Sequence, residues 1–577
     1  MADILTMSRL LGFKDFYPNE IPKPKAYYAS KVGRDIIEKT TPFFLSYLKF
    51  GGFPKLPELL QDWFTYNDFK YYQSPYYLHI ETEYRRITNF HNGEIHSLLS
   101  VESLLNLYIW LSKEQGIKET IEYPDASVTL PLLELILLFN DDVLQNYQKA
   151  TESIRQFGEH RKLQRLILAG SFSQSDLINI DYAQLFYTQV YKKAKLLTFL
   201  ENSEYYKNLL DRLLFEFGCN SKEEFLKAIG SAVLGGIKAK EPSWTVLTTK
   251  NSPDAENGVL ILENLALQEN ELNVIDQDDY LSLRNKPFKK IADGEYRVIF
   301  ELFLIKKLYN GLIFKLSSYD DNFLGKIRND FSEEVLLYDI LQSIFNSQSI
   351  IKITGNKFKK FHLKREPDFY LRINQDILLF ESKDFFMRGG IKLSYDFSII
   401  EEELMKDGRL KKAVVQLVRN IDRCLKKEIP TDDTYSSNDV SIFPIIVVHD
   451  SLYSAPGLNY WIYYWFLDEL ELLKQDAFYA NYNFAQILPV TIVEIDTLIL
   501  YEQQFIEQKL DLVALIKDYH RFVRFGEEKN IDPKMIETHT LQSALSFSEF
   551  VRNYSHKLGI QINFDIISGM LTKFGIT

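Results

Sequence analysis

Apolar residues recur at the three- and four-residue spacing of amphipathic helices through most of residues 1–240. Two clear examples are Val101 to Lys113 and Tyr206 to Phe217, and the second is followed by Gly218, a residue that commonly ends helices. No internal repeat and no low-complexity block interrupts this pattern. We therefore predict a large, mainly helical N-terminal region.

The pattern changes near Glu241 and predicts an α+β junction over residues 241–325. β-branched and apolar residues there form short stretches separated by turn residues, and helical periodicity returns only later. The expected elements are strands at Thr245 to Thr249, Val259 to Glu263 and Tyr296 to Ile299, and a helix at Phe300 to Leu312.

The next region, residues 326–496, has the periodicities of a helix, three strands, a helix and a strand, in that order. The expected elements are Ser332 to Phe345, Ile350 to Thr354, Asp368 to Ile373, Ile377 to Lys383, Glu402 to Lys427 and Ile442 to His449. The last strand is apolar enough to be buried on both faces, and Pro444 indicates that pairing begins after it. This order predicts an α/β domain, with a mixed sheet flanked by helices.

Helical periodicity returns over residues 497–577, where Leu498 to Phe522 and Leu541 to Tyr554 are the expected helices. These residues are predicted to form a helical C-terminal segment.

The second and third expected strands form a hairpin that gathers charged side chains. Glu381 and Lys383 lie two residues apart and therefore share one face of their strand. A turn on Asn374–Gln375 pairs position 368 with 381, whereas a turn one residue later pairs it with 383. Either register brings Asp368 beside both residues.

Pro367-Asp368 followed by Glu381-Ser382-Lys383 resembles the active-site signature of the PD-(D/E)xK, or restriction-endonuclease-like, nuclease superfamily. The resemblance covers roughly residues 330–450. It implies a restriction-endonuclease-like core in the α/β domain and a metal-dependent endonuclease that hydrolyses phosphodiester bonds. It also implies a recognition or regulatory role for residues 1–240 and a function in prokaryotic restriction or anti-phage defence.

Two converging carboxylates repel each other unless a cation lies between them, and hard oxygen ligands suit Mg²⁺ or Mn²⁺. The expected ligands are the side chains of Asp368 and Glu381 and the backbone carbonyl of Ser382. The Lys383 ammonium group would orient or help to deprotonate the attacking water and stabilise charge on the scissile phosphate.

Two further residues follow from the resemblance. The superfamily usually adds a glutamate from the helix before the strands, and Glu333 is preferred to Glu334 because it precedes Leu336 and Leu337 by three and four residues. The choice between the two glutamates stays open. Related enzymes often carry a glutamine on the helix after the acid-x-lysine strand, and Gln416 is similar.

The net charge of -12 argues against a nucleic-acid partner, but the average hides a local reversal. Residues 351–427 contain 18 Lys+Arg and 11 Asp+Glu, a net charge of +7, so the rest of the chain carries -19. We expect nucleic acid, DNA rather than RNA, to contact these basic residues: Lys357, Lys359, Lys360, Lys364, Arg365, Lys412, Arg419 and Arg423. For the last three, an ordinary solvated helix face is an equally good interpretation.

Two pairs, Arg86 with His91 and Arg155 with His160, have the R-x4-H spacing of helical HEPN-type ribonucleases. Chance matches are expected among nine histidines, and Gly158 interrupts the second pair, so surface or capping histidines are the favoured interpretation.

Other signals are weaker. His91, Glu94 and His96 could bind a metal, but the turn at residues 92–93 favours a structural role. No phosphate-binding loop ending in Gly-Lys-Ser/Thr is present. Cys219 and Cys424 are expected to be buried, reduced thiols.

The N-terminus has no secretion signal, and the apolar runs are too short to cross a bilayer, so we expect a cytoplasmic protein that does not contact membranes. A partner protein or a homo-oligomer is compatible with the sequence. The alternative function is a non-catalytic nuclease-like scaffold that binds nucleic acid or a partner protein.

Overall fold

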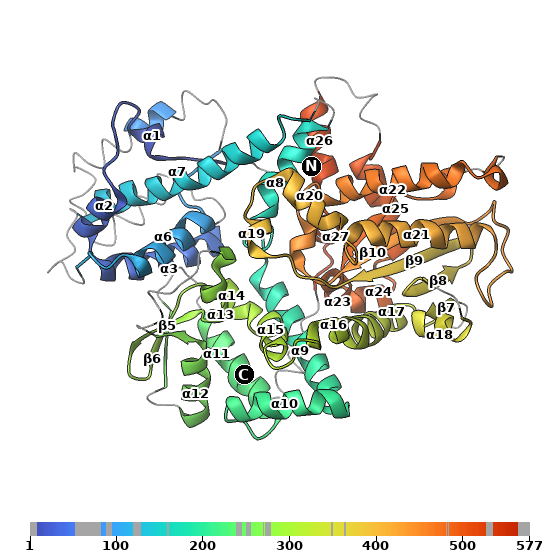
Figure 1. Cartoon of the computed structure of the whole chain (residues 1–577), viewed down its shortest axis with the longest axis horizontal. Helices are drawn as coiled ribbons and strands as arrows, with labels where there is room; N and C mark the ends of the chain where they lie inside the picture. The colour runs from blue at the N-terminus through green and yellow to red at the C-terminus, as the bar shows by residue number, and fades with distance from the viewer. Residues whose placement is uncertain are drawn as a thin grey trace. The chain divides into compact units, whose positions relative to one another are not determined.

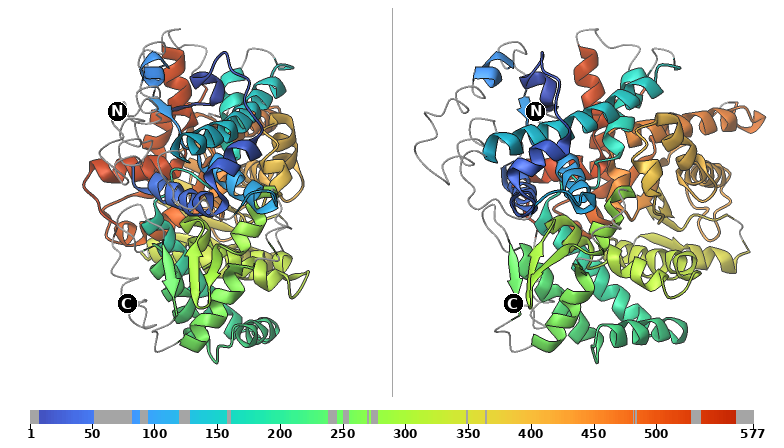
Figure 2. Two further views of the ribbon diagram at one scale, coloured as in Figure 1. Left: turned by 90° about the vertical axis from the view of Figure 1, so that its left-hand side faces the viewer. Right: turned by 60° about the vertical axis from the view of Figure 1, so that its left-hand side comes forward.

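The chain has a mixed α/β fold, with helices around short sheets (Figures 1 and 2). The computed structural model describes residues 8–51, 82–87, 95–118, 128–157, 161–237, 245–249, 255–268, 271, 278–347, 350–362, 365–480, 482, 484–526 and 535–562. Of the helices in these ranges, none combines the length and the apolarity that crossing a bilayer requires.

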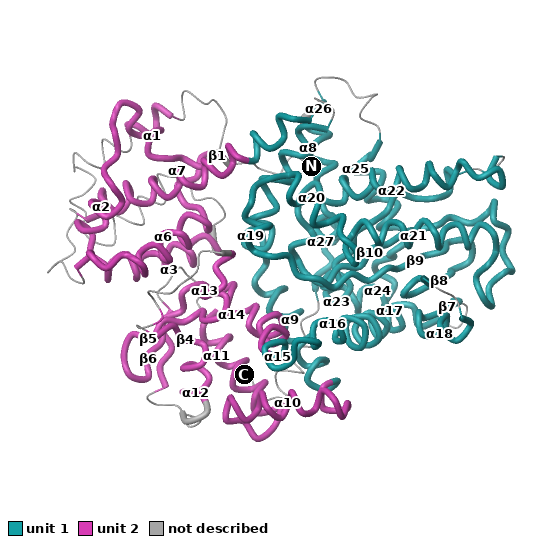
Figure 3. Tube along the Cα trace, viewed as in Figure 1, with its two compact units in different colours: residues 1–4, 150–199, 316–569 teal, residues 5–149, 200–315, 570–577 magenta. Residues whose placement is uncertain are grey.

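Two compact units are each built from separate chain segments (Figure 3). Unit 1 comprises residues 1–4, 150–199 and 316–569, and unit 2 comprises residues 5–149, 200–315 and 570–577. The four consecutive regions expected from the sequence, 1–240, 241–325, 326–496 and 497–577, stay a prediction, because compactness in space neither requires nor excludes them.

Unit 2 contains helices, a two-stranded parallel sheet β1-β2 and a four-stranded sheet in the order β3-β6-β5-β4. The elements that lie mainly in it are β1 (Ser8–Leu10), α1 (Phe13–Phe16), α2 (Lys25–Val32), α3 (Arg34–Gly51), β2 (Ile95–Ser97), α6 (Val101–Lys113), α7 (Thr129–Ser153), α10 (Glu204–Glu216), α11 (Lys222–Ile237), β3 (Val246–Thr248), α12 (Ala255–Leu265), β4 (Ala266–Leu267), η4 (Asp278–Tyr280), α13 (Leu281–Asn285), β5 (Phe288–Ala292), β6 (Glu295–Val298), α14 (Glu301–Lys306) and α15 (Asn310–Ser317).

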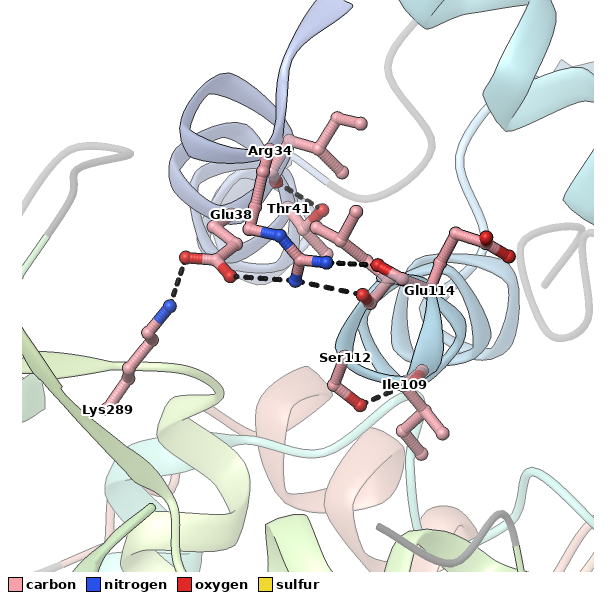
Figure 4. Close-up of polar contacts among 9 residues, drawn as sticks. Arg34, Glu38, Thr41, Ile109, Ser112, Glu114 and Lys289 are labelled. Atoms are coloured by element: carbon pink, nitrogen blue, oxygen red, sulfur yellow. Dashed lines mark hydrogen bonds and ion pairs between the residues drawn. The ribbon is translucent and has the colours of Figure 1, made fainter. Parts of the chain in front are cut away.

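A buried glutamate joins helix and sheet in unit 2 (Figure 4). Glu38 on α3 pairs with Lys289 on β5, and its other oxygen lies 3.7 Å from Arg34 Nη1. Arg34 also donates to the backbone carbonyls of Leu111 and Glu114 at the end of α6. The two cations compensate the buried carboxylate, as buried charges require.

Unit 1 contains the five-stranded sheet and the helices around it. The elements that lie mainly in it are α8 (Lys162–Phe172), α9 (Tyr182–Glu201), α16 (Phe323–Ile327), η5 (Arg328–Leu337), α17 (Tyr338–Ile344), β7 (Ile351–Thr354), α18 (Gly355–Lys360), β8 (Phe369–Ile373), β9 (Asp376–Lys383), α19 (Gly389–Lys392), α20 (Phe397–Met405), α21 (Leu410–Leu425), β10 (Ser441–Val448), η6 (Ser451–Ser454), α22 (Leu458–Lys474), η7 (Ala477–Tyr479), η8 (Phe484–Gln486), β11 (Thr491–Glu494), α23 (Ile495–Leu500), α24 (Glu502–Ile506), α25 (Leu512–Val523), α26 (Ile536–Ala544) and α27 (Phe547–Lys557).

The sheet order is β11-β10-β9-β8-β7. β7, β8 and β9 form an antiparallel meander, whereas β9, β10 and β11 are parallel to one another. α21 connects β9 to β10 and packs against both strands, in agreement with a crossover helix between parallel strands. The expected helix, three strands, helix and strand are therefore all present, and the mixed sheet is confirmed.

The prediction that pairing begins after Pro444 is wrong. Pairing with β9 begins at Ser441, and on the other side of β10 Ile442 forms a bridge with Ile487 before the ladder with β11 begins at Ile445. A proline removes only its own N–H, so the residues before it can still pair.

The expected strand at Val259 to Glu263 is wrong, because these residues lie in helix α12. Ile261, Leu262 and Leu265 are buried at the one-, three- and four-residue offsets of a single helix face. A short apolar run does not distinguish a strand from a buried helix segment.

Several expected helices are interrupted. Residues 402–427 are divided between α20 and α21 by a turn in which Gly408 has φ +80°, a left-handed conformation that glycine adopts without strain. Residues 300–312 are likewise divided between α14 and α15, and residues 498–522 among α23, α24 and α25. In the last case Asp511 caps α25 by accepting a hydrogen bond from the Ala514 N–H and so fixes a new helix start.

Candidate active site

The β8–β9 hairpin has the first of the two expected registers. Ile373 pairs with Asp376 and Phe369 pairs with Phe380, so the turn residues are 374 and 375. Asn374 has φ +53°, which asparagine tolerates better than most residues. The next position along the ladder places Asp368 opposite Glu381.

Asp368, Ser382 and Lys383 are joined by short hydrogen bonds. The Ser382 N–H donates to Asp368 Oδ2 at 2.6 Å, and Lys383 Nζ donates to the Ser382 carbonyl at 3.2 Å. Lys383 Nζ also lies 2.6 Å from Glu381 Oε1, and only 1% of the Glu381 side chain is exposed. The second oxygen of Glu381 is buried and has no hydrogen-bond partner among the described residues. The hairpin thus brings the three expected residues together.

Proximity and burial shift the titration of this cluster. Burial, followed by the neighbouring Asp368 carboxylate, raises the pKa of Glu381 to about 8 against the opposing effect of Lys383. Burial and Asp368 also raise the pKa of Glu333 to about 7, and burial raises the pKa of Asp368. Burial alone would lower the pKa of Lys383, but the carboxylates, led by Glu381, raise it above its ordinary value. The positive charge near the three carboxylates is too small for all of them to be ionised at the same time.

Glu333 lies on the π-helical segment η5, where the backbone is wider than in an α-helix. The Tyr338 N–H bonds to the Glu333 carbonyl, and the Tyr338 hydroxyl donates to Glu333 Oε1 at 3.0 Å. Glu334 instead has Oε1 4.0 Å from Lys359 Nζ. Glu333 is therefore the glutamate that shares the site with Asp368. The sequence did not indicate Tyr338, because residues five apart, such as Glu333 and Tyr338, are neighbours on a π-helix but not on an α-helix.

Gly355, at the start of α18, lies against the same cluster. Its N–H donates to the Asp368 carbonyl at 2.8 Å. A Cβ atom at this position would lie 3.0 Å from Tyr338 Oη, 3.3 Å from the Asp368 carbonyl oxygen and 3.3 Å from Glu333 Oε1. These distances are shorter than ordinary van der Waals contacts.

We expect Gly355→Ala to displace Glu333 and Asp368 and to lower about tenfold the rate of the nuclease reaction that the sequence predicts, since small misplacements of reacting groups are costly. Gly325→Ala is the matched control, because a Cβ atom there meets nothing within 4 Å. Single-turnover cleavage and thermal unfolding are measured for both variants. Equal rates for the two variants and wild type would show that this contact does not position the site.

Sequence reasoning also missed His449, which follows β10. Its Nε2 atom lies 2.9 Å from Ser382 Oγ, on the opposite face of β9 from Glu381 and Lys383. Only 7% of the histidine is exposed, and burial lowers its pKa. Ser382 is thus held through its N–H, its carbonyl and its side chain. His449 could have been identified from its position, because it ends an apolar strand that was expected in the same sheet as the acid-x-lysine strand.

The basic segment before β8 lies mainly on the surface. Lys357, Lys359, Lys360 and Arg365 are exposed, and Lys359 lies near enough to Glu333 and Asp368 to oppose the rise in the pKa of both. Lys364 lies outside the described residues.

Some of the polar residues on α21 that were expected to contact nucleic acid make contacts within the protein instead. Lys412 pairs with Asp407 at 2.9 Å. Arg423 donates to the Arg365 carbonyl at 2.9 Å and to Asn420 Oδ1 at 2.7 Å. Arg419 and Gln416 make no such bond among the described residues, and the buried Gln416 Oε1 has no partner there. The structure does not join Gln416 to Asp368, Glu381 or Lys383 by a hydrogen bond, although α21 packs against β9.

A divalent cation fits two features of the cluster. Glu381 has a buried oxygen without a partner, and Lys383 Nζ already contacts two of the three expected ligands, Glu381 Oε1 and the Ser382 carbonyl. The position therefore attracts positive charge. Within the described ranges no three His, Cys, Asp or Glu side chains form a ready-made metal-ligand group. The expected set has only two such side chains, with a backbone carbonyl as the third ligand.

The rival sites gain no support. His91, Glu94 and His160 lie outside the described residues. Arg86 donates to Glu83 and to the Asp15 carbonyl, and His96 is buried in β2. Cys219 and Cys424 are both buried thiols that form no disulfide among the described residues, in agreement with the prediction.

Comparison of the chain with protein-family models, with curated proteins and with solved structures finds no match.

Proposed function

We propose that the protein is a metal-dependent nuclease of the PD-(D/E)xK type, with a restriction-endonuclease-like core and with Asp368, Glu381, Lys383 and Glu333 in its active site. The observation that carries this proposal is the convergence of three acids and one ammonium group at one end of the sheet, with raised carboxylate pKa values. DNA is the preferred substrate class, and we expect the enzyme to act in the cytoplasm, in restriction or anti-phage defence.

Each residue of the proposed active site has its own role in the reaction. Asp368, Glu381 and the Ser382 carbonyl would hold Mg²⁺ or Mn²⁺, which supplies Lewis-acid polarisation of the phosphate and acidifies water. Lys383, whose raised pKa keeps it protonated, donates to the scissile phosphate and stabilises its developing charge. Glu333, with a pKa of about 7, is suited to accept a proton from the attacking water near neutral pH.

The direct test is incubation of the full-length protein with plasmid DNA, linear DNA and RNA in Mg²⁺ or Mn²⁺, beside Asp368→Ala. We expect cleavage by wild type that EDTA abolishes and that the variant lacks. Equal cleavage by both proteins would reject this site.

Metal binding is expected to weaken as the pH falls. Glu381, one of the proposed ligands, has a pKa of about 8 without metal, so below this pH it is protonated, and a metal must displace the proton. Affinity for Mn²⁺ should fall roughly tenfold per pH unit for each proton displaced. Titration calorimetry at about pH 6 and about pH 8.5 measures this change.

Glu469→Gln is the control for this titration, because Glu469 is a half-buried carboxylate that pairs with Lys411 and is not one of the proposed site residues. It should bind Mn²⁺ as wild type does, whereas Glu381→Gln should not bind at this site. An affinity that is independent of pH, or unchanged in Glu381→Gln, contradicts the assignment.

One observation favours the second candidate, a non-catalytic scaffold that binds nucleic acid or a partner protein. The Lys383 ammonium group pairs with Glu381 without the help of a metal, as in a structural ion pair. This function predicts metal-independent, salt-sensitive binding that Lys383→Ala leaves unchanged, without turnover in any metal.

A further inference from the structure

Two phenylalanines interrupt the basic segment between β7 and β8, and they differ completely in burial. Phe358 is fully buried, and its ring lies edge-on to Tyr370 at 6.4 Å between centroids. Phe361 leaves 44% of its surface exposed and makes no aromatic ring contact within the described part of the chain. An isolated exposed apolar side chain is common, so the surroundings of Phe361 decide what the ring is for.

Those surroundings are strongly basic. Residues 355–366 contain five Lys+Arg and one Glu, a net charge of +4, so the remainder of the chain carries -16. The exposed basic side chains near the ring in sequence are Lys357, Lys359, Lys360, His362 and Arg365. An aromatic face among such groups suits a ligand that combines phosphates with flat, apolar rings.

Phe361 is also close to the candidate active site. It follows helix α18, whose first residue, Gly355, bonds to the Asp368 carbonyl at 2.8 Å. Six residues at about 1.5 Å per residue separate Phe361 from Gly355 by about 9 Å along the helix axis. This span is roughly three base steps of about 3.4 Å.

We propose that Phe361 is a stacking platform for an unpaired base of the strand that enters the active site, and that the preferred substrate is therefore single-stranded or locally unpaired nucleic acid. Bases of any identity stack on an exposed aromatic ring beside a basic groove. In an intact duplex the base faces are covered by their neighbours, so the ring gains nothing there. This inference rests on the proposed nuclease function, because the path of the strand is taken from the proposed active site. It specifies the class of substrate.

Binding is tested with the full-length protein in EDTA, so that metal-dependent cleavage cannot interfere. The probes are a fluorescent oligothymidine, a hairpin duplex with the same label, and a single strand that contains 2-aminopurine, whose fluorescence falls on stacking. Phe361→Ala should weaken single-strand binding about 5- to 150-fold and remove the 2-aminopurine quenching, while duplex binding stays unchanged. Phe361→Trp should restore both signals.

Phe314→Ala is the matched control, because Phe314 is also 44% exposed but lies on α15, outside the basic segment. It should bind as wild type does. Lys360→Ala should weaken single-strand and duplex binding alike, since it removes only a phosphate contact.

The inference is overturned if Phe361→Ala binds the single strand as wild type does, or loses duplex affinity equally. These outcomes are separate from failure of the nuclease proposal. Stacking that depends on Phe361, without cleavage in any metal, rejects the nuclease and supports the platform. Cleavage with unaltered binding by Phe361→Ala rejects the platform and supports the nuclease.

Discussion

Lys383→Ala is expected to lower the cleavage rate about 10²- to 10⁴-fold while the protein stays folded. The variant removes the ammonium group that lies 2.6 Å from Glu381 Oε1 and 3.2 Å from the Ser382 carbonyl. Charge that develops on the scissile phosphate then loses its only ammonium donor among the residues assigned to the site. The fold survives because Glu381, with a pKa of about 8, can remain protonated at neutral pH once its partner is lost.

The matched control is Lys474→Ala. Lys474 pairs with Glu471 on the exposed side of α22 in the same unit, so its loss should leave cleavage unchanged. Single-turnover rates with excess enzyme separate chemistry from product release. If Lys383→Ala cleaves as fast as wild type, the ammonium group has no role in the reaction.

Asp432→Ala is expected to cost about 3–5 kcal/mol of stability, because it leaves a charge without its partner in a buried site. Asp432 is fully buried and accepts hydrogen bonds from Tyr370 Oη at 2.6 Å and from Arg372 Nε and Nη2, both at 2.7 Å. Tyr370 and Arg372 lie on β8, directly after Asp368. The network thus anchors the strand that presents the first carboxylate.

Urea denaturation of the full chain measures this loss, and the adjacent Asp433→Ala serves as the control. Asp433 is exposed, so its replacement should leave the midpoint of urea denaturation the same as that of wild type. Tyr370→Phe should cost less, about 1 kcal/mol, because the carboxylate keeps the guanidinium group. An unchanged transition for Asp432→Ala would mean that β8 is held without this network.

The hairpin was predictable because two local rules agree. Side chains two apart share a strand face, and a two-residue turn on Asn374 fixes which positions are opposite. Asp368, Glu381 and Lys383 therefore meet as the sequence indicates. The chain order from η5 to β10 was predictable from periodicity, whereas the edge strand β11 was not expected from the sequence.

Other features depend on interactions that periodicity does not contain. The π-helical turn places Tyr338 beside Glu333, a pairing that the three- and four-residue spacing of an α-helix does not predict. His449 reaches Ser382 only because β10 lies parallel to β9 in one particular register. The break before α21 had a signal, Asp407-Gly408, but the apolar repeat that starts at Leu410 led to the prediction of one helix over Glu402 to Lys427.

Anomalous diffraction from crystals grown with Mn²⁺ tests the central claim most directly. We predict a manganese peak bounded by the carboxylates of Asp368 and Glu381 and the Ser382 carbonyl, with Lys383 Nζ moved away from Glu381. The absence of a peak there, with the Lys383–Glu381 pair intact while Mn²⁺ binds elsewhere or not at all, would contradict the account.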